Sequence, residues 1–380
     1  MYSLRQYLLT LEDPHGLTRR LGEVELSRDA QGRALYSAGN SAAVFRIRRA
    51  GRVEALRCYF RPMRHLQEIY GDRYLPEELY LYTSPDRGEW VDVVLNDWIE
   101  GETLQRAIET AARAHDRERL AALAAAFDRL AAELVSDDRA HGDLKPDNII
   151  AGADGKLHII DLDASFLPAF AGEASPETGT AAFQHPARTA EDFDARLDDY
   201  PAALISTALH ALNIDPTLYD RYGERDGLLF VPRDIRTDAA LDEVLALLSR
   251  EGRAAEYRIA RLLRSETLRL PELAQLLRYL TTERAEPAGE PELFAENGLW
   301  GYRVGTAEVI PPLYDCGFDF TEGLAAVRLG ATWHYVDPAG RVVLSCPGYE
   351  AVKPFRNDRA QAIRAGRRVA IDPAGREFEI

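Results

Sequence analysis

One short segment near the middle of the chain concentrates the residue types that handle phosphate chemistry. It runs from His141 to Asn148 and contains Asp143 and Lys145, and Asp161 follows it after a short apolar stretch. An aspartate can accept or orient the proton of an attacking hydroxyl, and a lysine can offset charge on a transferring phosphoryl group. Asparagine and aspartate supply oxygen ligands of the kind that Mg²⁺ prefers. We therefore expect these residues to lie at one site.

The segments 141–150 and 155–163 resemble the catalytic loop and the metal-binding segment of protein kinases. The resemblance implies that Asp143 and Lys145 are catalytic and that Asn148 and Asp161 hold Mg²⁺ against the phosphates of ATP. It also implies the fold class, which is α+β: a two-lobed protein-kinase-like fold with ATP and Mg²⁺ bound between the lobes.

The use of lysine in the chain supports a role for Lys145. Of the 46 basic residues only three are lysine, namely Lys145, Lys156 and Lys353. Arginine has replaced lysine almost everywhere else, so a lysine that remains within the motif is expected to have a reason to remain.

Three further positions match the kinase pattern. Thr180 follows Gly179 at what resembles the end of an activation segment, and the resemblance implies that Thr180 contacts Asp143 and Lys145. Asp198 is expected to brace the catalytic loop as a structural residue. The stretch 95–104 resembles the hinge between the lobes, where adenine would hydrogen-bond to the backbone near Asp97 and Ile99.

The glycine-rich loop that covers ATP phosphates in kinases is only partly present. The pattern G-x-G-x-x-G-x-V corresponds here to residues 37–44, where one glycine of three remains. Small residues still let the backbone approach phosphate, although less freely than glycine does. The resemblance places nucleotide contacts at Gly39, Asn40, Ser41 and Val44.

Other departures from the pattern are larger. Arg57 stands where kinases carry the strand lysine that pairs the α- and β-phosphates with a helix glutamate. Glu68 is the candidate for that glutamate, and a solvated helix charge is the alternative for the same residue. Arginine keeps the charge but is longer, planar and forked. Gly142 replaces the arginine before the catalytic aspartate, so a phosphorylated loop has no obvious receiver. Asp163 replaces the glycine of D-F-G, which keeps the metal ligand Asp161 and loses the flexible residue.

The hydrophobic pattern predicts strands first and helices later. Alternating segments at 34–36, 43–47, 53–59 and 91–95 predict strands, and helical spacing marks 105–134, 202–212, 239–248 and 256–263. Residues 1–100 would form the small lobe and 101–282 the helical lobe. Residues 283–293 are charged and rich in proline and glycine, which indicates a linker between parts that fold independently.

An internal repeat occupies the end of the chain. The quintet Asp337–Arg341 recurs identically at Asp372–Arg376, and Trp300-Gly301-Tyr302 is echoed at Trp333. Asp-Pro-Ala-Gly suits a tight turn, so each unit is predicted to be strand, turn, strand, with the units stacked into one β domain over 294–380. This region closely resembles the bacterial WG-repeat family, and such a domain would recruit a substrate or partner.

Composition excludes several classes of function. A net charge of −16 argues against binding to nucleic acid. No apolar run is long enough to predict a membrane span, and the first residues do not resemble a secretion signal. Three scattered cysteines suit neither a disulfide framework nor a zinc cluster. We therefore expect a cytoplasmic protein with no nucleic-acid or membrane partner.

Together these features predict an ATP- and Mg²⁺-dependent protein kinase of the Ser/Thr type with a WG-repeat recruitment domain. Arg57 and the depleted glycine loop leave open an alternative, a pseudokinase that serves as a nucleotide-binding or inert scaffold. A small-molecule kinase is a further alternative, because Gly142 before Asp143 also occurs in kinases of the aminoglycoside phosphotransferase type. The Gly179-Thr180 signature and the linked repeat domain count against it.

Overall fold

The computed structural model describes residues 1–84, 86–223 and 227–379. Helices and strands are mixed over most of this length, and the described residues from Glu292 onward form only strands and turns. The predicted α and β mixture with an all-β C-terminal region is therefore confirmed. In the described part of the chain, no helix has the length and apolar character needed to cross a membrane.

The chain forms two compact units. The first comprises Met1–Gly101 with two short later segments, Gly152–Asp154 and Asp161–Ser165. The second comprises Glu102–Ala151, Gly155–Ile160 and the chain from Phe166 onward.

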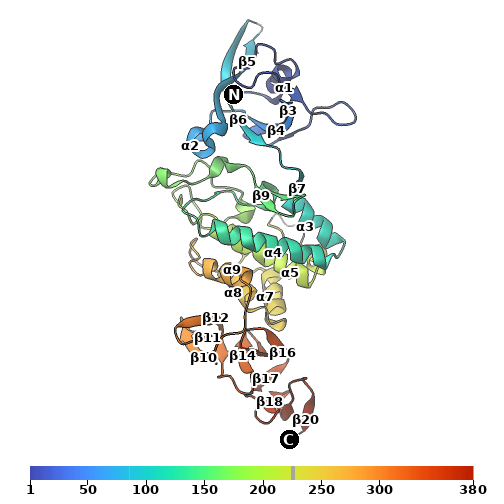
Figure 1. The fold of residues 1–380 in the computed structure, drawn as a ribbon, viewed down its shortest axis with the longest axis vertical. Coiled ribbons are helices and arrows are strands. Elements are labelled where there is room, and N and C mark those ends of the chain that lie inside the picture. Colours follow the sequence, from blue (N-terminus) through green and yellow to red (C-terminus); the bar gives the residue numbers. More distant parts are fainter. Residues whose placement is uncertain (85, 224–226, 380) are drawn as a thin grey trace. The chain divides into compact units, whose positions relative to one another are not determined.

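An antiparallel sheet forms the centre of the first unit (Figure 1). Its strands follow the order β1-β3-β4-β6-β5, and the short β2 pairs with β3. The elements are α1 (Leu4–Glu12), β1 (Glu25–Leu26), β2 (Tyr36–Ala38), β3 (Ala42–Arg49), β4 (Arg52–Tyr59), α2 (Leu66–Tyr70), the 3₁₀ turn η1 (Gly71–Arg73), β5 (Tyr74–Ser84) and β6 (Arg87–Asp97).

Strand alternation separates the two faces of this sheet. Phe45 of β3 and Leu56 of β4 belong to the buried core that includes residues of α1. Their chain neighbours Val44 and Arg57 lie opposite each other in the register, and Val94 of β6 is the partner of Arg57 on its other side. Opposite partners share a face. Arg57 therefore lies on the second face of the sheet, where a smaller buried cluster contains Ala42, Tyr59, Leu66, Tyr70 and Val94.

Helices dominate the beginning of the second unit. The single helix expected over 105–134 is divided, because His115 adopts a left-handed φ of +53° and Asp116 caps the next helix by accepting a hydrogen bond from the Arg119 nitrogen at 2.9 Å. The helices are α3 (Leu104–Arg113), α4 (Arg117–Leu134), α5 (Asp199–Ile214), α6 (Thr217–Tyr222), α7 (Ala239–Arg250), α8 (Ala254–Leu262) and α9 (Leu273–Thr281).

Strands β7 (Gly101–Thr103), β8 (Ile149–Gly152) and β9 (Leu157–Ile159) form a small sheet. The 3₁₀ turns are η2 (Pro146–Asn148), η3 (Leu162–Ala164), η4 (Pro168–Phe170), η5 (Ala181–Phe183) and η6 (Pro232–Asp234), of which η3 belongs to the first unit.

The repeat region consists of three antiparallel sheets, β10-β11-β12, β13-β14-β15-β16 and β17-β18-β19-β20. Both Asp-Pro-Ala-Gly segments make the expected turns, because the nitrogens of Gly340 and Gly375 donate to Asp337 and Asp372 at 2.9 and 2.8 Å. Each repeat has three or four strands instead of the expected two. The strands are β10 (Glu292–Glu296), β11 (Leu299–Val304), β12 (Ala307–Tyr314), β13 (Cys316–Gly317), β14 (Ala325–Leu329), β15 (Thr332–Val336), β16 (Val342–Cys346), β17 (Tyr349–Val352), β18 (Ala360–Arg364), β19 (Arg367–Ile371) and β20 (Glu377–Glu379).

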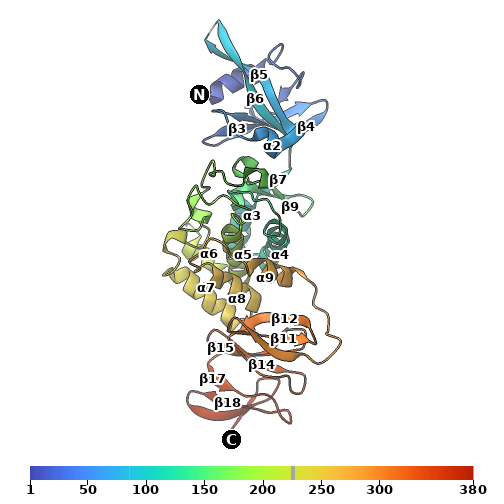
Figure 2. The same cartoon turned by 90° about the vertical axis from the view of Figure 1, so that its left-hand side faces the viewer.

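The first two sheets of the repeat region share a hydrophobic core with the helices. Figures 1 and 2 show β11 and β12 beside α8 and α9. Ile310 and Leu313 of β12 are fully buried in the same cluster as Ile259 of α8 and Leu273 of α9. Residues 283–291 form no helix or strand, as a linker should, yet the domain beyond them is packed on the helices. This packing differs from the independent folding that the linker pattern predicts.

Buried polar contacts reinforce this interface. Arg258 of α8 donates from Nε to the Leu313 carbonyl at 2.5 Å and from Nη2 to Asp315 at 2.9 Å. Ser249 of α7 donates to the Leu329 carbonyl at 2.5 Å, and its own carbonyl pairs with His334 Nε2 at 2.8 Å. These buried polar groups therefore have hydrogen-bond partners across the interface, as buried groups inside a single domain do.

Candidate active site

The loop that carries Asp143 lies between α4 and β8, and a buried carboxylate holds its backbone. Asp198, just before α5, is 1% exposed and accepts hydrogen bonds from the backbone nitrogens of His141 at 2.5 Å and Gly142 at 3.0 Å. Gly142 has a φ of +79°, a conformation that suits glycine. Burial raises the pKa of Asp198, while His141 and the two backbone donors oppose the shift. The bracing role expected for Asp198 is confirmed by these contacts.

The ring of His141 fixes the same loop from within. Its Nδ1 accepts a hydrogen bond from the Asp143 nitrogen at 3.2 Å, so its Nε2 carries the proton that is donated to the Ile160 carbonyl at 2.9 Å. The loop is thereby tied to the residue that follows β9.

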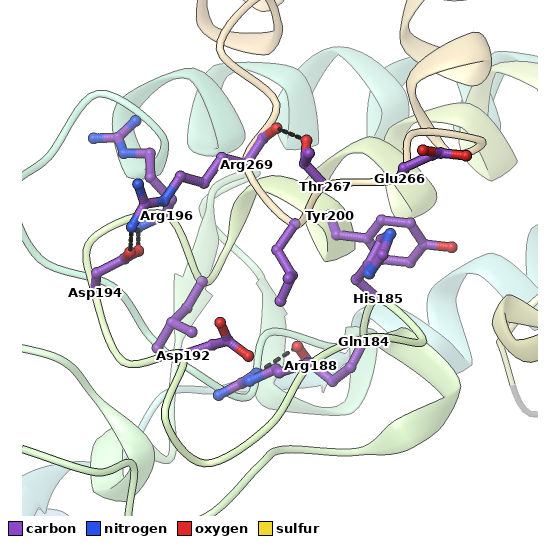
Figure 3. Close-up of a pocket in the computed structure, with 12 residues that line it drawn as sticks. Gln184, His185, Arg188, Asp192, Asp194, Arg196, Tyr200, Glu266, Thr267 and Arg269 are labelled. Atoms are coloured by element: carbon purple, nitrogen blue, oxygen red, sulfur yellow. Dashed lines mark hydrogen bonds and ion pairs between the residues drawn. The ribbon is translucent and has the colours of Figure 1, made fainter.

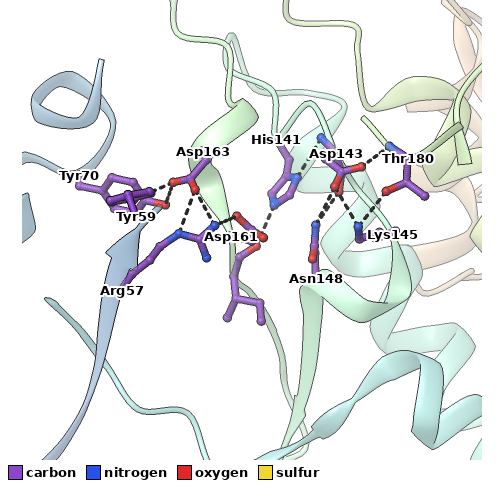
Figure 4. A network of polar contacts seen from close by, with 11 residues as sticks. Arg57, Tyr59, Tyr70, His141, Asp143, Lys145, Asn148, Asp161, Asp163 and Thr180 are labelled. Atoms are coloured by element: carbon purple, nitrogen blue, oxygen red, sulfur yellow. Dashed lines mark hydrogen bonds and ion pairs between the residues drawn. The ribbon is translucent and has the colours of Figure 1, made fainter. Parts of the chain in front are cut away.

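Four side chains form what we call the Asp143 cluster: Asp143, Lys145, Asn148 and Thr180. The Thr180 nitrogen donates to Asp143 Oδ1 at 2.6 Å, and Lys145 Nζ lies 3.1 Å from Asp143 Oδ2. Lys145 Nζ also donates to Thr180 Oγ1 at 2.8 Å. Asn148 Nδ2 donates to the Asp143 carbonyl at 2.9 Å and to its Oδ2 at 3.3 Å. Figure 4 shows these groups directed at the Asp143 carboxylate, and the contacts expected of Thr180 are confirmed.

A second polar group, the Arg57 cluster, lies in the first unit and consists of Arg57, Tyr59, Tyr70, Asp161 and Asp163 (Figure 4). Arg57 donates to Asp163 Oδ2 from Nε at 2.9 Å and from Nη2 at 2.5 Å, and its Nη2 also donates to Asp161 Oδ1 at 2.6 Å. The hydroxyls of Tyr59 and Tyr70 donate to Asp163 Oδ1 at 2.9 and 2.7 Å.

The charges within this cluster support one another. Burial alone would lower the pKa of Arg57, but the carboxylates of Asp163 and Asp161 outweigh it and raise that pKa above its usual range. Burial, together with Asp163, raises the pKa of Tyr59 and Tyr70, so both remain neutral hydrogen-bond donors. Arg57 is therefore a permanently charged and firmly held cation.

Asp161 adopts a strained backbone conformation. Its φ of +64° and ψ of +63° lie in the left-handed region, which costs of order 1 kcal/mol for a residue with a Cβ. Such strain tends to persist at functional positions. Asp161 belongs to the first unit and its expected partner Asn148 to the second, so their joint metal site stays a prediction.

The remaining predicted nucleotide contacts lie in the first unit. Gly39, Asn40 and Ser41 connect β2 to β3, and Val44 is the cross-strand partner of Arg57. A Cβ on Gly39 would meet nothing within 4 Å, so this loop does not depend on glycine there. Asp97 ends β6, paired with Glu54 of β4, and Ile99 follows outside the strand.

Of the two alternatives for Glu68, pairing with Arg57 is wrong and a solvated helix charge agrees with the structure. Glu68 is exposed on α2, and the carboxylates that pair with Arg57 are Asp163 and Asp161. From α2 it is Tyr70 that reaches the cluster, through Asp163. The pattern missed Asp163, Tyr59 and Tyr70 as site residues. The sequence signal that could have indicated this cluster is Asp163 itself, an aspartate at the position where the kinase pattern has glycine.

The two residues predicted to hold Mg²⁺, Asn148 and Asp161, are both oxygen donors. Among the residues that the structure describes, no group of three or more His, Cys, Asp or Glu side chains is arranged to hold a metal ion. Asn148 uses its Nδ2 on Asp143, which leaves its amide oxygen for other ligands. The amide oxygen of Asn148 and the carboxylate of Asp161 are each of the oxygen donor type that Mg²⁺ prefers.

A cavity of about 320 Å³ lies in the second unit, next to the segment that follows Thr180 (Figure 3). Arg188 lines it and donates from Nη1 to the Gly142 carbonyl at 2.8 Å and to Gln184. Burial lowers the pKa of Arg188, while Asp198 and Asp143 oppose the shift. The lining comes from residues 184–200 and 266–269 and contains none of the predicted nucleotide contacts.

Comparison with known proteins supports the prediction of a WG repeat in the C-terminal region. A family model described as a WG containing repeat matches residues 307–333, which span β12 to the start of β15. No curated protein matches the chain. The family match does not reach either polar cluster, so the interpretation of those clusters depends on their residues and geometry.

Proposed function

We propose that this chain is an ATP- and Mg²⁺-dependent phosphotransferase of the protein-kinase type, with a two-lobed kinase-like fold over residues 1–282. Its acceptor is a serine or threonine hydroxyl, and its place of action is the cytoplasm. The observation that supports this most strongly is the Asp143 cluster, in which a lysine, an asparagine and a backbone nitrogen converge on one accessible carboxylate.

Each member of that cluster has a chemical task in phosphoryl transfer. Asp143 orients the acceptor hydroxyl and takes its proton, and Lys145, 3.1 Å away, offsets negative charge on the transferring group. Thr180 holds the Asp143 carboxylate in one orientation through its backbone nitrogen. Bound Mg²⁺ would neutralise charge on the phosphates, and Asn148 and Asp161 would hold it.

The repeat region would recruit the protein substrate or a partner. This part of the proposal follows from the general use of stacked repeats as binding surfaces. The packing of the first repeats on α8 and α9 favours a fixed position for that surface over a flexible tether.

A pseudokinase scaffold is the second candidate, and one contact favours it. Arg57 Nη2 lies 2.6 Å from Asp161 Oδ1, so a guanidinium pairs with the carboxylate that a metal would need. Under this alternative, the Arg57 cluster closes the site and no phosphate is transferred.

A melting scan tests the proposed function. ATP with Mg²⁺ should raise the melting temperature of the chain, because a ligand that binds only the folded state stabilises it by about 2.7 kcal/mol at 100 times its Kd. ATP with EDTA should give a much smaller shift, since Asn148 and Asp161 act through the metal. The absence of any shift at millimolar ATP and Mg²⁺ would contradict the proposal.

A further inference from the structure

The carboxylate of Asp163 is saturated with hydrogen bonds. Its side chain is 6% exposed, and it accepts two bonds from Arg57 on Oδ2 and one each from Tyr59 and Tyr70 on Oδ1. The donors come from β4 and α2, so one carboxylate of the η3 turn joins three elements of the first unit. A group held in this way has one position and one charge state.

Arg57 and Asp163 both depart from the kinase pattern, and each departure compensates for the other. A guanidinium has a rigid fork of donors that matches a carboxylate in a two-bond contact, which a lysine ammonium cannot make. A buried arginine also needs a compensating charge nearby. A kinase with glycine at position 163 would leave this fork without its main partner, and Asp163 on its own would be a buried anion without a cation.

The geometry points to Asp163 as a positioning residue that holds Arg57 in place as the phosphate-binding cation, in the role that a helix glutamate has in kinases. This inference depends on the proposed function and adds to it the residue that fixes the cation. Asp163 and Asp161 accept hydrogen bonds from Nε and Nη2 of Arg57. Nη1 is therefore the nitrogen that donates to a phosphate oxygen.

Two observations separate this role from that of a second metal ligand. Both oxygens of Asp163 are already occupied by donors, whereas a metal ligand needs a lone pair directed at the ion. Glu68 is exposed, and α2 contributes the Tyr70 hydroxyl in its place. The helix therefore acts on Arg57 through Asp163.

Steady-state kinetics of Asp163→Asn test the inference. The value of kcat/KM for ATP should fall about 100-fold, because a misplaced positioning group costs about that much. The Mg²⁺ concentration for half-maximal rate should stay at the wild-type value. Asp13→Asn, at an exposed aspartate of the same unit, is the matched control and should behave as wild type.

Tyr70→Phe gives a milder test that does not put folding at risk. It removes one hydrogen bond to the Asp163 carboxylate and should lower kcat/KM for ATP about 10-fold. Tyr74→Phe is its control, because Tyr74 also donates to an aspartate of the first unit, Asp92, at 2.7 Å. If Asp163→Asn does not fold, equal rates for Tyr70→Phe and Tyr74→Phe overturn the inference.

A double-mutant comparison decides between the two roles. If Asp163 acts through Arg57, adding Arg57→Lys to Asp163→Asn lowers the rate no further than the more severe single change. The positioning role is overturned if the rate losses of the two single variants multiply in the double variant. It is also overturned if Asp163→Asn requires more Mg²⁺ than wild type. An active wild type with an unaffected Asp163→Asn refutes this inference alone, and a wild type without ATP turnover refutes the proposed function together with it.

Discussion

The two polar clusters differ in how they are held. In the Asp143 cluster, the side chains of Asp143 and Lys145 are 16% and 24% exposed, and backbone groups and the buried Asp198 keep the loop in shape. In the Arg57 cluster, Arg57 and Asp163 are 10% and 6% exposed, the Asp161 side chain is 37% exposed, and the cation is held by side chains alone. The first arrangement suits groups that must touch a substrate, and the second suits a cation that must not move.

The clusters also depend on different parts of the chain. The Asp143 cluster belongs to the unit whose helices share a core with the repeats, whereas the Arg57 cluster lies on the sheet of the first unit. Changes can therefore be chosen that affect one cluster and spare the other.

Removal of the repeats should cause the largest loss of stability, and this loss should occur in the second unit. A chain that ends after Glu286 exposes the apolar surface that packs on Ile310 and Leu313, at about 1.5–3 kcal/mol for each buried side chain, and leaves Arg258 without its partners. Such losses approach the 5–15 kcal/mol that usually stabilises a folded domain. Hydrogen exchange should show α7 and α8 losing protection while β3 and β4 keep theirs.

The control for this truncation is a chain that ends after Cys346. It removes only β17–β20, whose buried side chains belong to a separate cluster with the second repeat. Protection of α7 and α8 should survive. Unchanged protection of both helices in the chain that ends at Glu286 would show that the shared core does not stabilise them.

Asp198→Ala should destabilise the second unit next most strongly. It leaves the buried nitrogens of His141 and Gly142 without acceptors, at about 1–3 kcal/mol for each group. Urea unfolding measures this loss. Asp242→Ala is the comparison, because the Asp242 side chain is 64% exposed and its pair with Arg264 is worth less than about 1 kcal/mol. Equal losses in the two variants would contradict a bracing role for Asp198.

Arg57→Lys should have a smaller effect, and it should be confined to the first unit. A single ammonium cannot reproduce the two-bond contact with Asp163 together with the contact to Asp161, so about 1–3 kcal/mol of stability should be lost. Arg19→Lys, at an exposed pair with Glu77, should cost little. If hydrogen exchange places the loss in the helices of the second unit, the separation of the two clusters is wrong.

The smallest expected effect is a pH dependence of stability, which also concerns the second unit. Burial alone would lower the pKa of His210, but its hydrogen bond to Asp128 and the charge of Glu256 outweigh burial and raise the pKa above its ordinary value of 6.5. Protonated His210 thus contributes stability that is complete below pH 6.5 and is lost as the pH rises through the higher folded pKa. The opposing charge is Arg253, from the start of α8.

His210→Gln should therefore lower the free energy of unfolding more at pH 6 than at pH 9. His334 offers a comparison of opposite sign, because burial lowers its pKa, so its contribution is present above pH 6.5 and is lost as the pH falls through the lower folded pKa. A deficit in His210→Gln that grows with pH would contradict the assignment.

Sequence separation explains why one cluster could be predicted and the other could not. Asp143, Lys145 and Asn148 lie within five residues of one another, so their spacing alone indicates a shared loop. The partners of Arg57 are 104 and 106 residues away from it. Only the folded sheet, with Arg57 on its second face, brings that strand to the turn that carries Asp163.

Other differences from expectation have equally local causes. The division between α3 and α4 depends on the left-handed conformation of His115, which an alanine-rich pattern does not reveal. The shared core was missed because Ile310 and Leu313 show by their pattern that they are buried, but not what covers them. Periodicity identifies a buried face, and the partner of that face is a property of the whole fold.

Phosphate transfer from labelled ATP, compared between wild type and Asp143→Asn, tests the central claim most directly. Wild type should label itself or a generic basic protein in the presence of Mg²⁺. Asp143→Asn should reduce the rate by about 10²–10⁴, the range expected for loss of a general base, while its melting shift with ATP and Mg²⁺ stays close to that of wild type. Equal background labelling by both proteins would contradict the account and would leave Asp143 as part of a fold that transfers no phosphate.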